Sequence, residues 1–188
     1  MRIVGGRWRG RNLAAPKSQG VRPTADRLRE SLFNILLHSY GDPVGGARVL
    51  DLFAGTGALG LEALSRGAAF ALFVDDGVEA RALLRQNVEA LGAGGMSRVF
   101  RRDATALGPA HPLEPFSLVF LDPPYVKGLA ERALVCAHEG GWLTPDALIV
   151  VEEKTGVFTT PPGFSEIERR AYDETEFSFL RLSKECSQ

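Results

Sequence analysis

The sequence predicts an α/β fold, with a mostly parallel seven-stranded sheet and helices on both of its faces. Two observations support this prediction. After residue 46, short apolar runs alternate with amphipathic stretches at helical spacing, which is the rhythm of βα units in a parallel sheet. Near the end of the chain, two strand-like runs follow one another across a short polar turn. We therefore expect a C-terminal hairpin that places an antiparallel strand in the sheet.

The elements follow one another in a regular order. Apolar runs predict strands at residues 47–52, 69–74, 97–101, 118–121 and 147–151, and the final hairpin adds strands at residues 164–172 and 176–182. The stretches between the first five strands predict helices at residues 58–66, 78–91 and 129–139, with a weak turn near residues 104–107. Seven strands and their connecting helices therefore occupy most of the chain.

The first 46 residues break this rhythm and predict an appendage. Ile3-Val4 and Asn12-Leu13 are separated by glycines, which indicates a short β-hairpin. Thr24 is a suitable N-cap for a helix from residue 25 to about residue 38. The loop at residues 40–46 carries three glycines and a proline, which mark a boundary. We thus predict an N-terminal hairpin and helix at residues 1–46 and a main domain at residues 47–188.

The composition is that of an ordinary globular protein. Its 188 residues, of which 45% are hydrophobic, suffice for one core. Two cysteines without a CxxC pair and three scattered histidines give no metal-binding pattern, so we expect no metal. No apolar stretch approaches the ~20 residues that span a bilayer, and the start of the chain lacks the apolar core of a signal peptide. We expect a monomer in the reducing cytoplasm, without a membrane partner.

Positive charge is concentrated at the start of the chain. Residues 1–30, called here the basic arm, carry a net charge of +6, whereas the remaining residues carry −7. Such an arm is a candidate surface for the phosphates of a nucleic acid. The alternative is a solvated terminus without a partner. The candidate RNA-binding residues are Arg7, Arg9, Arg11, Arg22 and Arg27.

Residues 51–60, with the sequence DLFAGTGALG, predict a cofactor loop between the first strand and the next helix. Gly55 and Gly57 allow a tight turn and a close approach of the backbone to a ligand, and the helix N-terminus supplies free N–H groups. Phe53 lies within the same loop and is a further candidate for the cofactor site.

Carboxylates after the first three strands extend this site. Asp51 can accept from an ammonium group, Asp75 from ribose hydroxyls and Asp103 from an adenine amine. The glycines also match the dinucleotide fingerprint, but a carboxylate directly before the loop would repel a pyrophosphate. The pattern therefore favours S-adenosylmethionine, which has an amino-acid end and an adenosine end, over NAD.

A second motif follows the fourth strand. Asp122, Pro123, Pro124 and Tyr125 place an acceptor carboxylate, two prolines and an aromatic ring at the end of a buried apolar run. The prolines stiffen this loop and donate no hydrogen bond, so its carbonyl groups are free to accept. The tyrosine can stack on a planar base, while the carboxylate and a proline carbonyl accept from an exocyclic amine. We name residues 122–125 the acceptor loop and predict them as the catalytic residues.

With both motifs, the chain resembles the class I S-adenosylmethionine-dependent methyltransferases, whose fold is Rossmann-like. More narrowly, it resembles the small-subunit ribosomal RNA methyltransferase D family. The resemblance rests on residues 6–13 (GRWRGRNL), 22–34 (RPTADRLRESLFN), 51–57 (DLFAGTG) and 121–125 (LDPPY). It covers nearly the whole chain. The acceptor loop is shared by adenine, guanine and glutamine methyltransferases, and the arginine-rich segments narrow the choice.

This resemblance implies methyl transfer from S-adenosylmethionine to the 2-amino group of one guanine in 16S ribosomal RNA. The partner would be ribosomal RNA, the 30S particle or an assembly intermediate. Two departures from the family pattern stand out. Asp75-Asp76 replaces a glutamate followed by a lysine, and Tyr172-Asp173 replaces a Tyr-Gly before the last strand.

Other functions remain open from the sequence. The same acceptor loop is compatible with an amino-methyltransferase that acts on adenine in DNA or on glutamine in protein. A catalytically silent RNA-binding module with the same fold is a second alternative, and a nucleotide-dependent oxidoreductase is a third.

Overall fold

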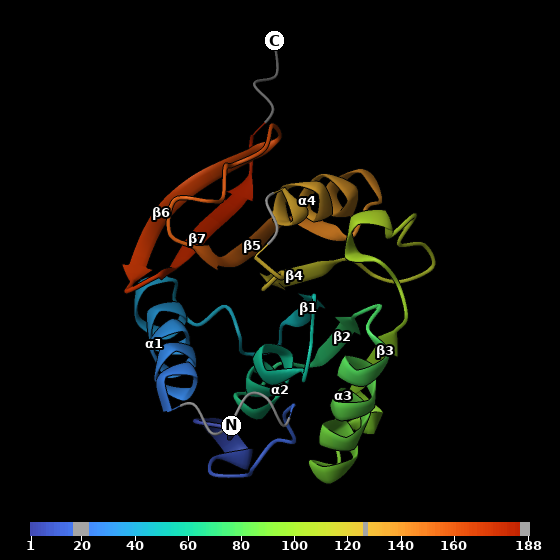
Figure 1. Cartoon of the computed structure of the whole chain (residues 1–188). Coiled ribbons are helices and arrows are strands. Elements are labelled where there is room, and N and C mark those ends of the chain that lie inside the picture. The colour runs from blue at the N-terminus through green and yellow to red at the C-terminus, as the bar shows by residue number, and fades with distance from the viewer. Residues whose placement is uncertain (17–22, 126–127, 185–188) are drawn as a thin grey trace.

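The computed structural model describes residues 1–16, 23–125 and 128–184. It contains a central sheet of seven strands, with helices packed on both faces (Figure 1). Arg22, which we predicted as an RNA-binding residue, lies outside the described residues. Within the described ranges, no helix combines the length and the apolar character needed to cross a membrane.

The sheet has the strand order β3-β2-β1-β4-β5-β7-β6. Its strands are β1 (Arg48–Leu52), β2 (Phe70–Val74), β3 (Ser97–Phe100), β4 (Phe116–Leu121), β5 (Leu143–Lys154), β6 (Phe164–Tyr172) and β7 (Thr175–Leu182). Strands β1 to β5 pair in parallel, and β7 pairs antiparallel with both β5 and β6. The predicted mostly parallel sheet with an antiparallel C-terminal strand is confirmed.

Apolar residues alternate between the two faces of the sheet and define two cores. In the described part of the chain the helices are α1 (Pro23–Ser39), α2 (Ala58–Ser65), α3 (Val78–Ala90) and α4 (Leu129–Glu139), with 3₁₀ turns at Gly6–Trp8, Gly94–Met96 and Ala104–Ala106. Leu118 and Leu148 pack in the cluster that also holds residues of α1, α2 and α3. Their neighbours Val119 and Ile149 pack in the cluster with α4. Successive strand residues point to opposite faces, so both faces are covered.

Strand β5 is longer than the sequence predicts. We expected residues 147–151, whereas the strand begins at Leu143 and ends at Lys154. Pro145 interrupts the apolar pattern and hides the first part, which pairs with β4 through Leu143 and Phe116 before a register shift. The end is extended because Lys154 pairs with Thr175 of β7. Backbone pairing of this kind leaves no signal in the hydrophobic pattern.

The N-terminal hairpin is also shorter than predicted. A single bridge joins Arg2 and Asn12, and a 3₁₀ turn separates them. Gly6 and Gly10 adopt φ angles of 72° and 83°, a conformation that curls the chain and ends regular pairing. Helix α1 begins at Pro23, one residue before the predicted N-cap Thr24. Proline is common at the first helical position because its missing N–H has no helical partner there.

Helix α1 packs into the core of the main sheet. Leu32, Phe33 and Leu36 are fully or almost fully buried and belong to the same cluster as Val49 of β1. The proposed division of the chain at residue 46 thus separates two segments that share one core, and it stays a prediction. At the other end of the sheet, Asp173 adopts a φ of 53° in the β6–β7 turn, a left-handed conformation that a glycine adopts without strain.

Candidate active site

A cavity of about 820 Å³ opens at the carboxyl ends of the central parallel strands. Open parallel sheets bind ligands at this edge, where the strand order reverses beside β1. The cavity is lined by every predicted catalytic and cofactor-binding residue except Gly57: Asp51, Phe53, Gly55, Asp75, Asp103, Asp122, Pro123, Pro124 and Tyr125. Strand order thus gathers motifs that lie far apart in the sequence.

The cofactor loop is held by carboxylates of the strands beneath it. Asp51 is 1% exposed, and one of its oxygens accepts from the backbone N–H of Gly60 at 2.9 Å. Asp75 accepts from Gly55 N–H at 2.8 Å and from Gly77 N–H at 2.8 Å, one bond at each oxygen. Burial raises the pKa of Asp51 well above its usual value. Both predicted ligand-binding carboxylates therefore also fix the loop.

The two predicted loop glycines have different surroundings. Gly55 lines the cavity, and a Cβ on it would meet only Phe53 O, at 4.0 Å. Gly57 points away from the cavity, and a Cβ there would lie 2.3 Å from Leu84 Cδ1. Gly57 is thus required by core packing and by its φ of 79°, and its predicted contact with the cofactor stays a prediction.

Asp103 lies at the rim of the cavity and caps the 3₁₀ turn after it. Its Oδ1 accepts from the backbone N–H of Thr105 at 2.8 Å and from the Thr105 hydroxyl at 2.7 Å. These hydrogen bonds lower the pKa of Asp103, so the carboxylate is charged at neutral pH. The predicted contact between Asp103 and an adenine amine stays a prediction.

The acceptor loop lies at the end of β4, beside the end of β5. The side chain of Asp122 is exposed to the cavity, and partial loss of water around its carboxylate raises its pKa to about 7, with a further contribution from the negative charge of Glu153. Tyr125 is 66% exposed and stands at the mouth of the cavity. A carboxylate inside and an aromatic ring at the mouth suit a planar base that enters from solvent.

Several wall residues were not predicted from the sequence. The N-terminal part of the chain contributes Met1, Ala25, Leu28 and Arg29, and β5 contributes Glu152. No local motif marks the N-terminal residues, because they reach the cavity only through tertiary packing. Glu152 carries a signal that could have been used, since it directly follows the apolar run predicted as a strand at residues 147–151, in the same way as the predicted aspartates.

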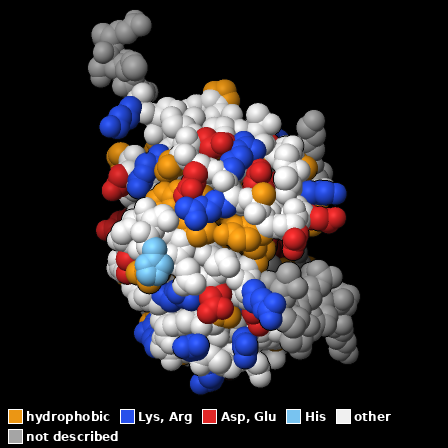
Figure 2. All heavy atoms as spheres, turned by 90° about the vertical axis from the view of Figure 1, so that its left-hand side faces the viewer, with side chains coloured by type: hydrophobic (Ala, Val, Ile, Leu, Met, Phe, Trp, Pro, Cys, Tyr) orange, Lys and Arg blue, Asp and Glu red, His pale blue; other side chains and the backbone are white. Residues whose placement is uncertain are grey.

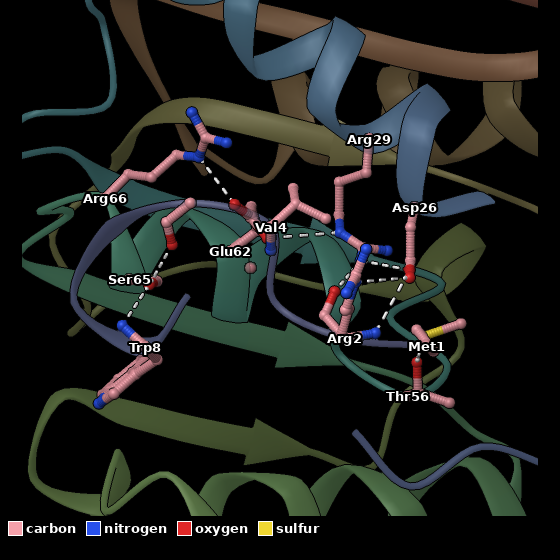
Figure 3. A network of polar contacts seen from close by, with 12 residues as sticks. Met1, Arg2, Val4, Trp8, Asp26, Arg29, Thr56, Glu62, Ser65 and Arg66 are labelled. Carbon is pink, nitrogen blue, oxygen red and sulfur yellow. Dashed lines mark hydrogen bonds and ion pairs between the residues drawn. The ribbon is translucent and has the colours of Figure 1, made fainter. Parts of the chain in front are cut away.

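Buried polar contacts clamp the N-terminal segment onto α2 (Figure 3). Glu62 is fully buried and accepts from Val4 N–H at 2.9 Å, while its carboxylate lies 3.4 Å from Arg29 Nε and 2.7 Å from Arg66 Nε. Ser65 accepts from the backbone N–H of Trp8 at 3.0 Å. These contacts hold the first residues against the helix that follows the cofactor loop.

Some arginines of the basic arm contact other parts of the protein, and others are exposed to solvent. Arg7 lies over the Trp8 ring, 4.3 Å from its centroid, and Arg11 donates to Ala90 O at 2.8 Å. Arg9 and Arg27 are exposed. Basic side chains gather at the lower end of the face shown in Figure 2, which is the end of the molecule where the N-terminal segment lies. That these arginines form one RNA-binding surface stays a prediction.

The charges in the cavity fit S-adenosylmethionine. Seven acidic residues line the cavity within the described part of the chain, Asp51 and Asp75 among them, and Arg29 of the wall cations is already paired with Glu62 and Asp26. An acidic cavity attracts a ligand with an ammonium and a sulfonium group, and it disfavours a pyrophosphate. Asp51, Gly55 and Asp75 would hold such a cofactor.

Comparison with known proteins agrees with this geometry. The family model described as conserved hypothetical protein 95 matches residues 1–181. Ribosomal RNA small subunit methyltransferase D of Escherichia coli K12 is 44% identical over 167 residues, with 88% of this chain and 81% of that protein covered. The chain belongs to this methyltransferase D family. It is therefore a methyltransferase with S-adenosylmethionine as its methyl donor.

Two further relatives extend the match. The Haemophilus influenzae protein of the same name is 37% identical over 173 residues, with 90% of this chain and 88% of that protein covered. The solved structure of Escherichia coli yhhF aligns with a TM-score of 0.81 and 38% identity, over 97% of this chain and 98% of that one. The methyltransferase fold is thus shared over almost the whole length, N-terminal segment included.

The two glycines of the methyltransferase loop should respond differently to a bulky residue. Gly55→Leu should abolish S-adenosylmethionine binding in a folded protein, because the side chain enters the cavity from an otherwise open position. Gly57→Leu should instead lower the melting temperature, because it collides with Leu84. Calorimetric titration and thermal melts of both variants separate the effects. Unchanged cofactor affinity in folded Gly55→Leu would refute the placement of the loop.

Methyl transfer should fall as the pH drops through about 7. Asp122 has a raised pKa, so below that pH it is protonated and loses its charge as an acceptor. The charged groups around it are Asp51 of β1, Glu152 and Glu153 of β5, and Arg29 of α1. Glu153→Gln removes a negative charge and should move the midpoint to lower pH. A pH profile of kcat/KM that is flat from about pH 5 to pH 8 would contradict this assignment.

Proposed function

We propose that this methyltransferase transfers a methyl group from S-adenosylmethionine to the exocyclic 2-amino group of a guanine in 16S ribosomal RNA. The observation that carries the proposal is the acceptor loop, which lines one cavity together with the cofactor loop. Relatives at 44% and 37% identity bear the name ribosomal RNA small subunit methyltransferase D, which supports the substrate class.

In this proposal, the acceptor loop aligns the amine with the methyl group and localises the lone pair on its nitrogen. Bound S-adenosylmethionine supplies a methyl group that is already activated by the sulfonium. The guanine amine is a poor nucleophile because its lone pair is delocalised into the ring. Asp122 and the carbonyl of Pro123 accept hydrogen bonds from its two N–H groups and bias the nitrogen toward tetrahedral geometry. This geometry directs the lone pair at the methyl carbon. In-line positioning is worth up to ~7–11 kcal/mol in well-oriented systems.

The target base reaches this loop by leaving its stack. Tyr125, exposed at the mouth of the cavity, offers a ring on which the base stacks, worth ~1–3 kcal/mol. Pro124 holds the ring in place by fixing the backbone before it. No strong base is needed, since the methylated ammonium formed by the transfer is acidic and loses its proton to solvent.

The basic arm binds the RNA backbone in this proposal. Replacing Arg7, Arg9 and Arg11 together by Ala should raise KM for RNA and reduce the slope of log affinity against log salt by ~0.7 for each phosphate that the protein no longer neutralises. Affinity for S-adenosylmethionine should not change, because none of these side chains lines the cavity. Filter binding at several salt concentrations measures the slope. Arg181→Ala, an exposed arginine on β7, is the control.

An unaltered RNA affinity at low salt in the triple variant would remove the arm's role in binding. Arg22 and Arg27 are the remaining members of the proposed surface. We further propose that the protein is a cytoplasmic monomer, and that residues 1–46 act as the RNA-recognition part of a methyltransferase domain at residues 47–188.

Transfer of labelled methyl groups to several acceptors tests the substrate class. The acceptors are naked 16S ribosomal RNA, 30S particles, an assembly intermediate, DNA and protein. We expect label in at least one of the three ribosomal acceptors and none in DNA or protein. Label in DNA or protein alone would support an adenine or glutamine methyltransferase and overturn the proposal. Cofactor binding without transfer to any acceptor would support a silent RNA-binding module.

A further inference from the structure

Two acidic residues that line the cavity, Asp122 and Glu152, come from the neighbouring strands β4 and β5. In the register of β4 and β5, Leu121 pairs with Val151, so Asp122 and Glu152 each follow a paired residue directly. Phe120 and Val150, two residues earlier, pack in the same core cluster. Because strand side chains alternate, Asp122 and Glu152 return to that same face of the sheet. Neighbouring strands are only ~4.8 Å apart, so the two carboxylates form one acceptor pair.

Neither side chain takes part in a hydrogen bond that stabilises the described part of the fold. Among the described residues, no protein group donates a hydrogen bond to the side chain of Asp122 or Glu152, whereas Asp51 and Asp75 both accept backbone N–H groups. Glu152 is only half-buried and lines the cavity. Carboxylates withdrawn from bulk water are costly unless donors satisfy them. The pair is thus arranged for donors that a ligand brings.

The nearby arginine does not satisfy Glu152. The guanidinium of Arg29 is 2.9 Å from Asp26 and 3.4 Å from Glu62, and it donates to Arg2 O. Burial and the charge of Asp122 raise the pKa of Glu152 well above its usual value, and the positive charge of Arg29 offsets them only in part. Because Arg29 makes its contacts elsewhere, the carboxyl oxygens of Glu152 are left free to accept from a base.

Guanine presents two adjacent donors that match such a pair. Its 2-amino group is bonded to a ring carbon whose neighbour N1 carries a hydrogen. The 6-amino group of adenine and the 4-amino group of cytosine lie next to ring nitrogens with lone pairs instead. A second carboxylate beside the first thus attracts guanine and repels the lone pair of the other two bases. Flipped bases are read through hydrogen bonds to this edge.

We propose that Glu152 accepts the N1–H of the target guanine while Asp122 accepts its amine, so that Glu152 is the residue that selects guanine. This inference rests on the proposed guanine specificity. A site built to hydrogen-bond a donor rejects analogues that lack it, because its own buried polar group is then left unpaired.

A double-mutant cycle between Glu152 and N1–H tests this directly. One substrate is ribosomal RNA with guanine at the mapped target position, and the other carries 2-aminopurine there, which keeps the amine but has a lone pair at N1. Both are offered to the parent protein and to Glu152→Gln. The neutral amide can donate to the lone pair, so the ratio of kcat/KM for guanine over 2-aminopurine should fall at least about tenfold.

Glu153→Gln is the matched control, since it removes the adjacent charge without facing the cavity. It should alter both substrates alike and leave the ratio unchanged. Cofactor titration and a thermal melt of Glu152→Gln should resemble the parent, and Glu152→Asp, which keeps a carboxyl group, should retain most of the selectivity. If Glu152→Gln unfolds, the selectivity of Glu152→Asp and of Glu152→Ala decides the same question.

An equal loss with both substrates would overturn the inference and assign Glu152 a structural role. A loss of S-adenosylmethionine affinity with an unchanged ratio would assign it to the cofactor site and overturn the inference equally. If the parent methylates no guanine at all, the proposed function fails. If the parent forms N2-methylguanosine and the ratio does not change, only the role of Glu152 fails.

Discussion

Asp122→Ala should lose methyl transfer by about 100- to 1,000-fold, the range seen when one preorganised polar group is removed from a reacting centre. The substitution removes the carboxylate that accepts a hydrogen bond from the amine during methyl transfer. The side chain of Asp122 accepts no hydrogen bond from the described residues, so the fold should tolerate its loss. Single-turnover transfer of labelled methyl groups to ribosomal RNA measures the effect.

Cofactor binding is the internal control for this variant. Asp51 and Asp75 remain in place, so affinity for S-adenosylmethionine should stay within a few-fold of the parent. Turnover retained above about a tenth of the parent would remove Asp122 from its assigned role. A parallel loss of cofactor affinity would move it from the acceptor to the cofactor site.

Glu62→Ala should destabilise the protein by roughly 3–5 kcal/mol, the usual cost of removing one partner from a buried ion pair. Its loss leaves the guanidinium groups of Arg29 and Arg66 and the N–H of Val4 without their common acceptor in the core. For a chain of this size the melting temperature should fall by about 10 °C. Thermal and urea unfolding measure the change.

Glu89→Ala, an exposed glutamate on α3, is the matched control and should leave stability nearly unchanged. Because the clamp also places Met1 and Arg29 on the cavity wall, Glu62→Ala should weaken cofactor binding as well. A variant that melts with the parent would show that the N-terminal segment is held by its apolar contacts alone.

The sheet could be predicted because each strand is a short apolar run with sharp ends. The predicted β6 matches the structure, and β1 and β2 begin one residue later than expected. Strand pairing could not be predicted where it is not reflected in the pattern of apolar and polar side chains. Pro145 concealed the first part of β5, and the positive φ of Gly6 reduced the N-terminal hairpin to one bridge.

The acceptor and cofactor loops could be predicted because both are local sequences at strand ends, and the family they indicated is confirmed. The part of the cavity wall that Leu28 and Arg29 contribute could not be predicted, since it depends on how α1 packs on the sheet. Met1 lines the same cavity, although it lies in the N-terminal segment that we predicted as an appendage.

The identity of the methylated atom decides whether the acceptor loop directs a methyl group to the 2-amino group of guanine. It can be read by nucleoside mass spectrometry of 16S ribosomal RNA that has been treated with the purified protein and isotope-labelled S-adenosylmethionine. We expect label in N2-methylguanosine at one position, and none when Asp122→Ala is used. Label in N6-methyladenosine, in a ring carbon or in a ribose would show that the loop serves a different acceptor.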